Sequence, residues 1–207
     1  TAADVWIDKN GNGIKDCTNV NDCEWKTILF GGLGRGGRAY YALDVTDPNN
    51  PKPLQNTKDF RFNDGTGTPP APFPSVAYNQ DYESQYLGYT TSEPAVGRIK
   101  IIDDTNKLRE GWIAAFGLGW HSMGDPTFNR CPDSDPEPTE LPCYNSFQTP
   151  NAAVSRGVVI LNLNNMAKLY EAYYTVGASN HKSEMLYSVA GGVKLYDGDG
   201  DGFVDKM

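Results

Sequence analysis

The chain has 207 residues and a mass of 22.7 kDa, enough for one ordinary domain or two small ones with a hydrophobic core. Its 39% hydrophobic residues, 12% aromatic residues and 22 glycines are typical of a folded protein. The net charge of −8 argues against nucleic-acid binding, and no apolar run approaches the roughly 18 to 20 residues of a transmembrane helix. We expect any export signal to have been removed or to lie upstream.

Aspartate dominates the acidic residues, with 18 Asp and 8 Glu among the 26 acids, and 17 Asn and 14 Pro accompany it. Asp, Asn, Gly and Pro favour turns over helices, and carboxylates are the ligands that hard cations prefer. The composition therefore predicts an all-β protein that binds cations.

The first candidate site lies near the beginning of the chain. Oxygen-bearing groups alternate there with the spacing of a calcium loop, in which a backbone carbonyl supplies position seven. These positions are Asp8, Asn10, Asn12, the Ile14 carbonyl and Asp16. Asn at positions three and five and two lysines within the loop reduce its negative charge, so we expect weak calcium binding. The alternative is a solvated Asn-Gly hairpin turn.

Four cysteines form two local pairs, Cys17 with Cys23 and Cys131 with Cys143, each in a polar, turn-rich context. Neither pair has zinc-type spacing, so we favour two disulfides over free thiols or a metal site. Disulfides indicate an oxidising compartment, either the periplasm or the cell exterior.

Seven short runs have the composition of β-strands and are bounded by turn residues. They are Trp25–Phe30, Arg38–Val45, Ala95–Ile102, Gly111–Phe116, Gly157–Leu163, Leu169–Val176 and Leu186–Leu195. The stretch Met166–Tyr174 is compatible with a short helix, but its composition favours a strand.

Two stretches resemble each other. Each has a tryptophan, a strand and a glycine turn, followed by a second strand, and their tryptophans, Trp25 and Trp112, lie about two propeller repeats apart. This spacing favours β-propeller blades, against a chance similarity between antiparallel hairpins. Proline-rich insertions at about 49–85 and 121–156 are expected to be surface loops.

Enzyme motifs are not convincing. Gly32–Gly37 satisfies G-x-G-x-x-G but leads into a strand instead of a helix, so a glycine-rich hairpin is favoured. His121 has no supporting catalytic context. We therefore predict no catalytic residue and no enzymatic activity.

The sharpest motif is at the other end of the chain. Four aspartates alternate with glycines and a phenylalanine, which gives carboxylates at positions one, three, five and nine and a carbonyl at seven. The predicted calcium ligands are Asp197, Asp199, Asp201, the Phe203 carbonyl and Asp205. Four carboxylates this close repel one another unless a cation neutralises them.

Four segments together resemble the PilY family of type IV pilus tip-associated proteins, whose carboxy-terminal part is a calcium-binding β-propeller. They are Trp25–Pro48, Leu87–Ile99, Gly111–Trp120 and Tyr196–Lys206. The resemblance implies that residues 1–207 form part of a PilY-type propeller, with about four to five blades and an incomplete circle. It assigns the carboxy-terminal loop as the family's calcium loop and the Asp8–Asp16 loop as its Asn variant.

The same resemblance implies a role in pilus assembly and surface adhesion under the control of calcium. The implied location is the cell surface or pilus tip, reached through the periplasm, and the implied partners are minor pilins and a host or abiotic surface ligand. Two alternatives are a periplasmic quinoprotein-like dehydrogenase and a passive calcium-stabilised structural or glycan-binding module.

Overall fold

The computed structural model describes most of the chain outside the two proline-rich insertions. The described residues are 1–15, 19, 21–54, 60–62, 83–84, 86–102, 106, 108–120, 155–173 and 188–207. Within these ranges the chain forms ten strands and no helix, so the all-β prediction is confirmed. No helix long and apolar enough to cross a membrane was found in the part of the chain that was described.

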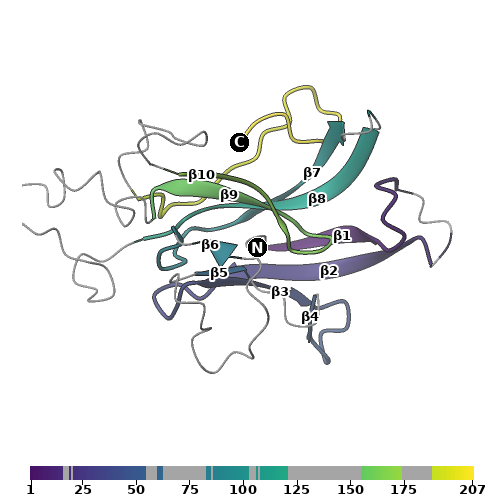
Figure 1. The fold of residues 1–207 in the computed structure, drawn as a ribbon. Coiled ribbons are helices and arrows are strands. Elements are labelled where there is room, and N and C mark those ends of the chain that lie inside the picture. The colour runs from purple at the N-terminus through teal and green to yellow at the C-terminus, as the bar shows by residue number, and fades with distance from the viewer. Residues whose placement is uncertain are drawn as a thin grey trace, which may run out of the picture.

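The strands form two sheets, which lie one above the other in Figure 1. The first sheet has the order β1-β2-β3-β5-β6, with β4 on β3, and contains β1 (Ala2–Asp8), β2 (Cys23–Gly32), β3 (Ala39–Asp44), β4 (Lys52–Pro53), β5 (Phe60–Phe62) and β6 (Glu83–Ser84). The second has the order β10-β9-β8-β7 and contains β7 (Ala95–Ile102), β8 (Leu108–Gly117), β9 (Gly157–Asn162) and β10 (Lys168–Tyr173). Only β5 and β6 pair in parallel; the other paired strands are antiparallel.

The core lies between the sheets and is built around three aromatic rings. Phe30 of β2 stacks on Tyr40 of β3 with a centroid distance of 5.8 Å, and Tyr40 meets Phe116 of β8 at 3.9 Å. All three side chains are fully buried. The Tyr40 hydroxyl donates to the Ser92 carbonyl at 3.0 Å, so its polar end is satisfied inside the core.

Six of the seven predicted strands are confirmed, with ends that differ by a few residues. The two similar stretches form equivalent hairpin-like pairs, because β2 pairs with β3 and β8 pairs with β9. The helical alternative for Met166–Tyr174 is wrong over 168–173, which form β10. The described residues show two sheets and no propeller circle, so the propeller stays a prediction.

Two differences from the expected strands have local causes. The prediction of a strand at Leu186–Leu195 is wrong for 188–195, which has no strand: Val189 donates to the Ser155 carbonyl and Val193 to the Glu93 carbonyl, with a Gly-Gly pair between them. Residues 188–195 therefore do not pair along any single neighbouring strand. Conversely, the sequence analysis did not predict β1, because its apolar run is short and leads directly into the amino-terminal loop that starts at Asp8. In the structure Val5 and Ile7 of this strand are buried.

Candidate metal-binding loops

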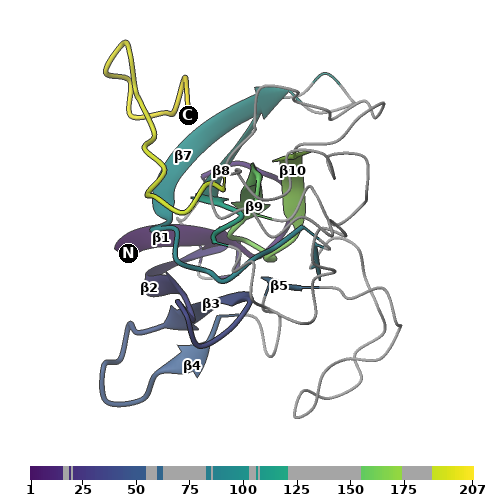
Figure 2. The same ribbon diagram turned by 90° about the vertical axis from the view of Figure 1, so that its left-hand side faces the viewer.

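The carboxy-terminal acidic loop brings three carboxylates together. Asp197, Asp199 and Asp205 each place one oxygen in a group whose members all lie within 4.8 Å of one another, and all three residues are exposed. The loop is closed at its base by Tyr196, which donates its N–H to the Lys206 carbonyl at 2.8 Å. Figure 2 shows this terminal segment, in yellow, beside β7. Three converging carboxylates provide the hard oxygen ligands that Ca²⁺ takes.

Backbone N–H groups hold these side chains in place. The Asp197 carboxylate accepts from Gly200 at 2.7 Å and from Gly202 at 2.8 Å, and Asp205 accepts from Gly198 at 2.7 Å. Gly200 and Gly202 have φ angles of +78° and +86°, in the left-handed region that side chains with a Cβ rarely adopt. The alternating glycines therefore let the chain turn tightly around its own carboxylates.

The fifth-position residue, Asp201, lies outside this group of three. Its Oδ1 accepts the Phe203 N–H at 2.9 Å, and its Oδ2 accepts from the Lys100 ammonium at 3.0 Å. The hydrogen bond from Lys100, followed by that from the Phe203 N–H, lowers the pKa of Asp201 below its ordinary value. A lysine of β7 thus neutralises one of the five predicted ligands.

The loop is anchored to β7 through Phe203, which is only 8% exposed. The Lys100 ammonium lies 3.6 Å from the centroid of the Phe203 ring, and the Arg98 guanidinium lies 4.3 Å from it. The next residue, Val204, donates its N–H to the Arg98 carbonyl at 2.8 Å. The acidic loop is consequently joined to the edge of the second sheet.

The amino-terminal loop repeats the same local hydrogen-bond pattern. The carboxylate at position one accepts the N–H groups of positions four and six, and the side-chain oxygens at positions three and five accept those of positions five and seven. The bonds are Gly11 and Gly13 to Asp8 at 2.7 and 2.6 Å, Asn12 to Asn10 at 3.0 Å, and Ile14 to Asn12 at 2.8 Å. Gly11 and Gly13 also have positive φ angles, +73° and +67°. The two loops, which share the same residue spacing, therefore have the same local backbone conformation.

The electrostatic setting of this first loop is less favourable to a cation. Among its described positions only Asp8 has a carboxylate, and Asp16 lies outside the described residues. The Arg109 side chain packs against Gly13, where an added Cβ would lie 2.6 Å from Arg109 Cδ, and its guanidinium donates to the Asn12 carbonyl. A fixed positive charge beside the loop opposes a second cation.

The cysteines are only partly covered by the described residues. Cys23 begins β2 opposite Asp8, is 3% exposed and takes part in a disulfide. Its partner lies outside the described residues, as do Cys17, Cys131 and Cys143. Both predicted pairings, Cys17–Cys23 and Cys131–Cys143, therefore stay predictions.

The residues that the sequence analysis missed are the two cations of β7. Arg98 and Lys100 are two positions apart on one strand, so their side chains share a face. Two basic residues at this spacing, in a chain with an excess of acids, indicate a strand face that contacts carboxylates. The identity of those carboxylates depends on the tertiary fold, since Asp201 is 101 residues from Lys100.

The fold and these loops define an antiparallel β protein with a carboxylate-rich candidate calcium loop, and comparison with known proteins gives its relatives. No family model matches the chain. The type IV pilus biogenesis factor PilY1 of Pseudomonas aeruginosa UCBPP-PA14 is 36% identical over 105 residues, which is 50% of this chain and 6% of that protein. A PilY1 homologue of Xylella fastidiosa is 24% identical over 188 residues, covering 90% of this chain and 9% of that protein.

Among solved structures, the carboxy-terminal domain of Pseudomonas aeruginosa PilY1 matches with a TM-score of 0.45 and 22% identity. That match covers 87% of this chain and 24% of the solved one. The chain thus spans less than a tenth of the two curated relatives. The resemblance to the PilY family is confirmed, and the chain is related to PilY-family type IV pilus proteins.

Proposed function

We propose that this chain is the calcium-responsive part of a type IV pilus-associated protein that acts, without enzymatic activity, in pilus assembly and surface adhesion. The supporting observation is the convergence of Asp197, Asp199 and Asp205 in a chain whose relatives are type IV pilus biogenesis factors. The proposal includes export to the cell surface or pilus tip, contact with minor pilins and with a host or abiotic surface, and a place in a β-propeller.

The proposed regulation follows from the charges of the carboxy-terminal loop. Asp197, Asp199 and Asp205 would hold the ion, together with the Phe203 carbonyl and, once released from Lys100, Asp201. A divalent cation supplies the positive charge that offsets repulsion between these carboxylates. Phe203 belongs to this loop and also lies against Arg98 and Lys100 of β7. Ordering of the loop therefore fixes a segment that is packed on the second sheet.

The amino-terminal loop is the proposed weaker site. Asp8, Asn10, Asn12, the Ile14 carbonyl and Asp16 would hold the ion, with fewer carboxylates than at the other end of the chain. Because affinity in such loops rises with the number of charged ligands, the carboxy-terminal loop is expected to fill first.

Calcium titration by calorimetry tests this proposal, with thermal unfolding in calcium and in chelator. The test variant is Asp197→Asn/Asp205→Asn, and the matched control is Asp4→Asn/Asp47→Asn, which removes the same charge away from both loops. We expect the test variant to lose the tighter binding event and the calcium-dependent rise in melting temperature, while the control keeps both. Equal calcium binding by the test variant and the wild type would refute the assignment of the site.

The same variants, introduced into the pilus protein of a bacterium that encodes it, test the biological role. Pilus number and attachment to a surface are measured in calcium and in chelator. We expect the test variant to behave in calcium as the wild type does in chelator. Calcium binding without any change in piliation or attachment would mean that the ion only stabilises the fold.

A further inference from the structure

The amino-terminal loop contains two Asn-Gly dipeptides in succession, Asn10-Gly11 and Asn12-Gly13, and the sequence has no others. A glycine after asparagine has no side chain to shield its nitrogen, so that nitrogen can approach the side-chain amide carbon, Cγ, of the asparagine. Asparagine is chemically labile in this setting, because attack of the backbone nitrogen on Cγ removes the side-chain amide. The loop therefore combines two reactive dipeptides with the spacing of a cation loop.

The reaction is an intramolecular substitution whose only co-reactant is water. The glycine nitrogen forms a bond to Cγ, the bond between Cγ and the side-chain nitrogen breaks, and that nitrogen leaves as ammonia with the proton that the glycine N–H has lost. Water then opens the five-membered imide at one of its two carbonyls, which gives either an aspartate or an isoaspartate. The net change for each asparagine is one water added and one ammonia released.

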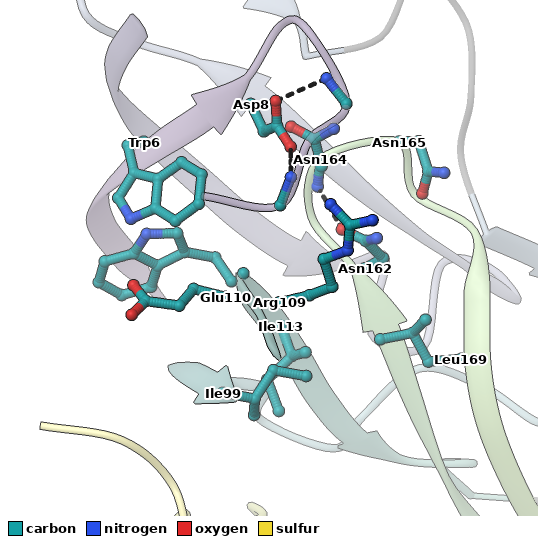
Figure 3. A pocket seen from close by; sticks show the side chains of 14 residues that line it. Trp6, Asp8, Ile99, Arg109, Glu110, Ile113, Asn162, Asn164, Asn165 and Leu169 are labelled. Carbon is teal, nitrogen blue, oxygen red and sulfur yellow. Dashed lines mark hydrogen bonds between the residues drawn. The ribbon is translucent and has the colours of Figure 1, made fainter. Parts of the chain in front are cut away.

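One carboxylate holds the attacking nitrogen of both dipeptides. The Gly11 N–H donates to Asp8 Oδ1 at 2.7 Å and the Gly13 N–H to Asp8 Oδ2 at 2.6 Å, which are the dashed lines at Asp8 in Figure 3. Both bonds favour the protonated amide, and the charge of Asp8 opposes the amide anion that attack requires. The glycines that follow aspartates in the carboxy-terminal loop also donate to carboxylates. The bonds that shape these turns therefore also slow the loss of the side-chain amide.

The two glycines differ in how firmly the rest of the fold holds them. The Gly13 carbonyl accepts the Glu110 N–H at 2.7 Å, and a Cβ built at Gly13 would lie 2.6 Å from Arg109 Cδ. No heavy atom lies within 4 Å of a Cβ built at Gly11. Because the glycine nitrogen has to turn toward Cγ, the second dipeptide, which is packed on β8, should react more slowly than the first.

We propose that Asn10 and Asn12 are sites of spontaneous deamidation, and that Asp8 controls the rate by holding both glycine nitrogens. The carboxy-terminal loop shows that aspartate products fit this turn. Asp199 and Asp201 occupy positions three and five there and accept the N–H groups of positions five and seven at 3.1 and 2.9 Å, as the two asparagines do in the first loop. Each aspartate formed adds one negative charge to the loop, whereas each isoaspartate lengthens its backbone by one carbon.

This inference goes beyond the proposed function and stands without it, because it rests on covalent chemistry and not on cation binding. Asn10→Asp/Asn12→Asp has the aspartate product at both positions. Calcium titration of that variant reports on the proposed function, while the rate of deamidation is measured without calcium. The two ideas can therefore fail separately.

The test follows deamidation of the 207-residue chain by peptide mapping with mass spectrometry, in mildly alkaline, calcium-free buffer with and without urea. Asp8→Ala removes the acceptor of both N–H groups, and the matched control Asp4→Ala removes an exposed carboxylate of the same strand. In the folded wild type we expect both asparagines to react roughly tenfold more slowly than in urea, or slower still, the factor of a hydrogen bond to a charged group. Asp8→Ala should recover most of this difference and Asp4→Ala none. Equal rates with and without urea, or no reaction in urea, would overturn the proposal.

Two further variants separate this local control from general unfolding. If Asp8→Ala does not fold, as judged by its thermal melt, Asp8→Asn takes its place. Asp8→Asn keeps one oxygen acceptor, so at least one of the two asparagines should react roughly threefold faster or more. Arg109→Ala leaves Asp8 in place but removes the side chain packed on Gly13, so Asn12 alone should react faster, whereas a destabilised fold would accelerate both asparagines. Any other pattern in Arg109→Ala, or an unchanged rate in the folded Asp8 variant, would overturn the proposed control.

Discussion

The ammonium of Lys100 lies 3.0 Å from the Asp201 carboxylate and 3.6 Å from the centroid of the Phe203 ring, so one side chain of β7 contacts two positions of the acidic loop. Asp201 is the fifth-position ligand expected from the sequence. The lysine thus acts as a tethered monovalent cation at a carboxylate that a calcium ion would share. It holds the loop on the sheet, and it would compete with a calcium ion bound there.

Replacement of Lys100 by methionine should therefore raise the calcium affinity of the carboxy-terminal loop. The expected gain is roughly twofold to fivefold, the range of an exposed ion pair. Lys100→Met also frees Asp201 to turn toward the other carboxylates. Calorimetric titration measures the change, with Lys52→Met on the exposed β4 as a control for loss of one positive charge. An affinity that is unchanged or reduced in Lys100→Met alone would show that the lysine does not compete.

Local and long-range features differ in how far the sequence predicts them. The turns of the two loops were predicted because the hydrogen bonds from backbone N–H groups to their carboxylates join residues no more than seven positions apart. The contact of Lys100 with Asp201 joins positions 101 residues apart, which no spacing rule reaches. The strand expected at Leu186–Leu195 is wrong over 188–195 for the same reason, because its apolar pattern gives no information about a partner strand.

The glycine at position six of the carboxy-terminal loop should be needed for its conformation. Gly202 has a φ of +86°, whereas an alanine in the left-handed region costs about 1 to 2 kcal/mol. Gly202→Ala should lower the free energy of unfolding by that amount in chelator and should also weaken calcium binding, since the Gly202 N–H bonds to Asp197.

Gly191→Ala is the matched control for this strain. No heavy atom lies within 4 Å of a Cβ built at Gly191, and its φ is not in the left-handed region. Its free energy of unfolding should stay within about 0.5 kcal/mol of the wild type. Urea denaturation of both variants makes the comparison, and equal effects would indicate that conformation at position 202 is unimportant.

The ion pair between Lys26 and Asp44 should contribute to stability in a pH-dependent way. The two groups are 2.6 Å apart and partly buried, on the neighbouring strands β2 and β3. Burial raises the pKa of Asp44, but hydrogen bonds from Lys26 and Thr46 outweigh this and leave the pKa below its ordinary value. The contribution is therefore present above about pH 4 and is lost as the pH falls through the pKa of the folded state.

Asp44→Asn removes this charge while keeping the Oδ1 that accepts from Thr46. We expect a loss of about 1 kcal/mol at pH 7 and a shallower decrease of stability below pH 4 than in the wild type. Urea denaturation from pH 2 to pH 7 measures both, with the exposed Asp47→Asn as control. Parallel acid limbs for wild type and Asp44→Asn would contradict the role of this carboxylate.

The hydroxyl of Tyr40 should help to hold the two sheets together. It belongs to β3 in the first sheet and donates to the Ser92 carbonyl at 3.0 Å, within 3.3 Å of the Gly117 carbonyl at the end of β8. Tyr40→Phe keeps the ring contacts with Phe30 and Phe116 but leaves the carbonyls without this donor, so the free energy of unfolding should fall by about 1 to 2 kcal/mol.

Tyr170→Phe provides the comparison, because Tyr170 is 43% exposed on β10. Its free energy of unfolding should change by less than about 0.5 kcal/mol. Burial also raises the pKa of Tyr40 well above that of an exposed tyrosine, so its hydroxyl stays protonated, and able to donate, at neutral pH. If Tyr40→Phe were as stable as the wild type, the contact between the sheets would depend on the packing of the three rings alone.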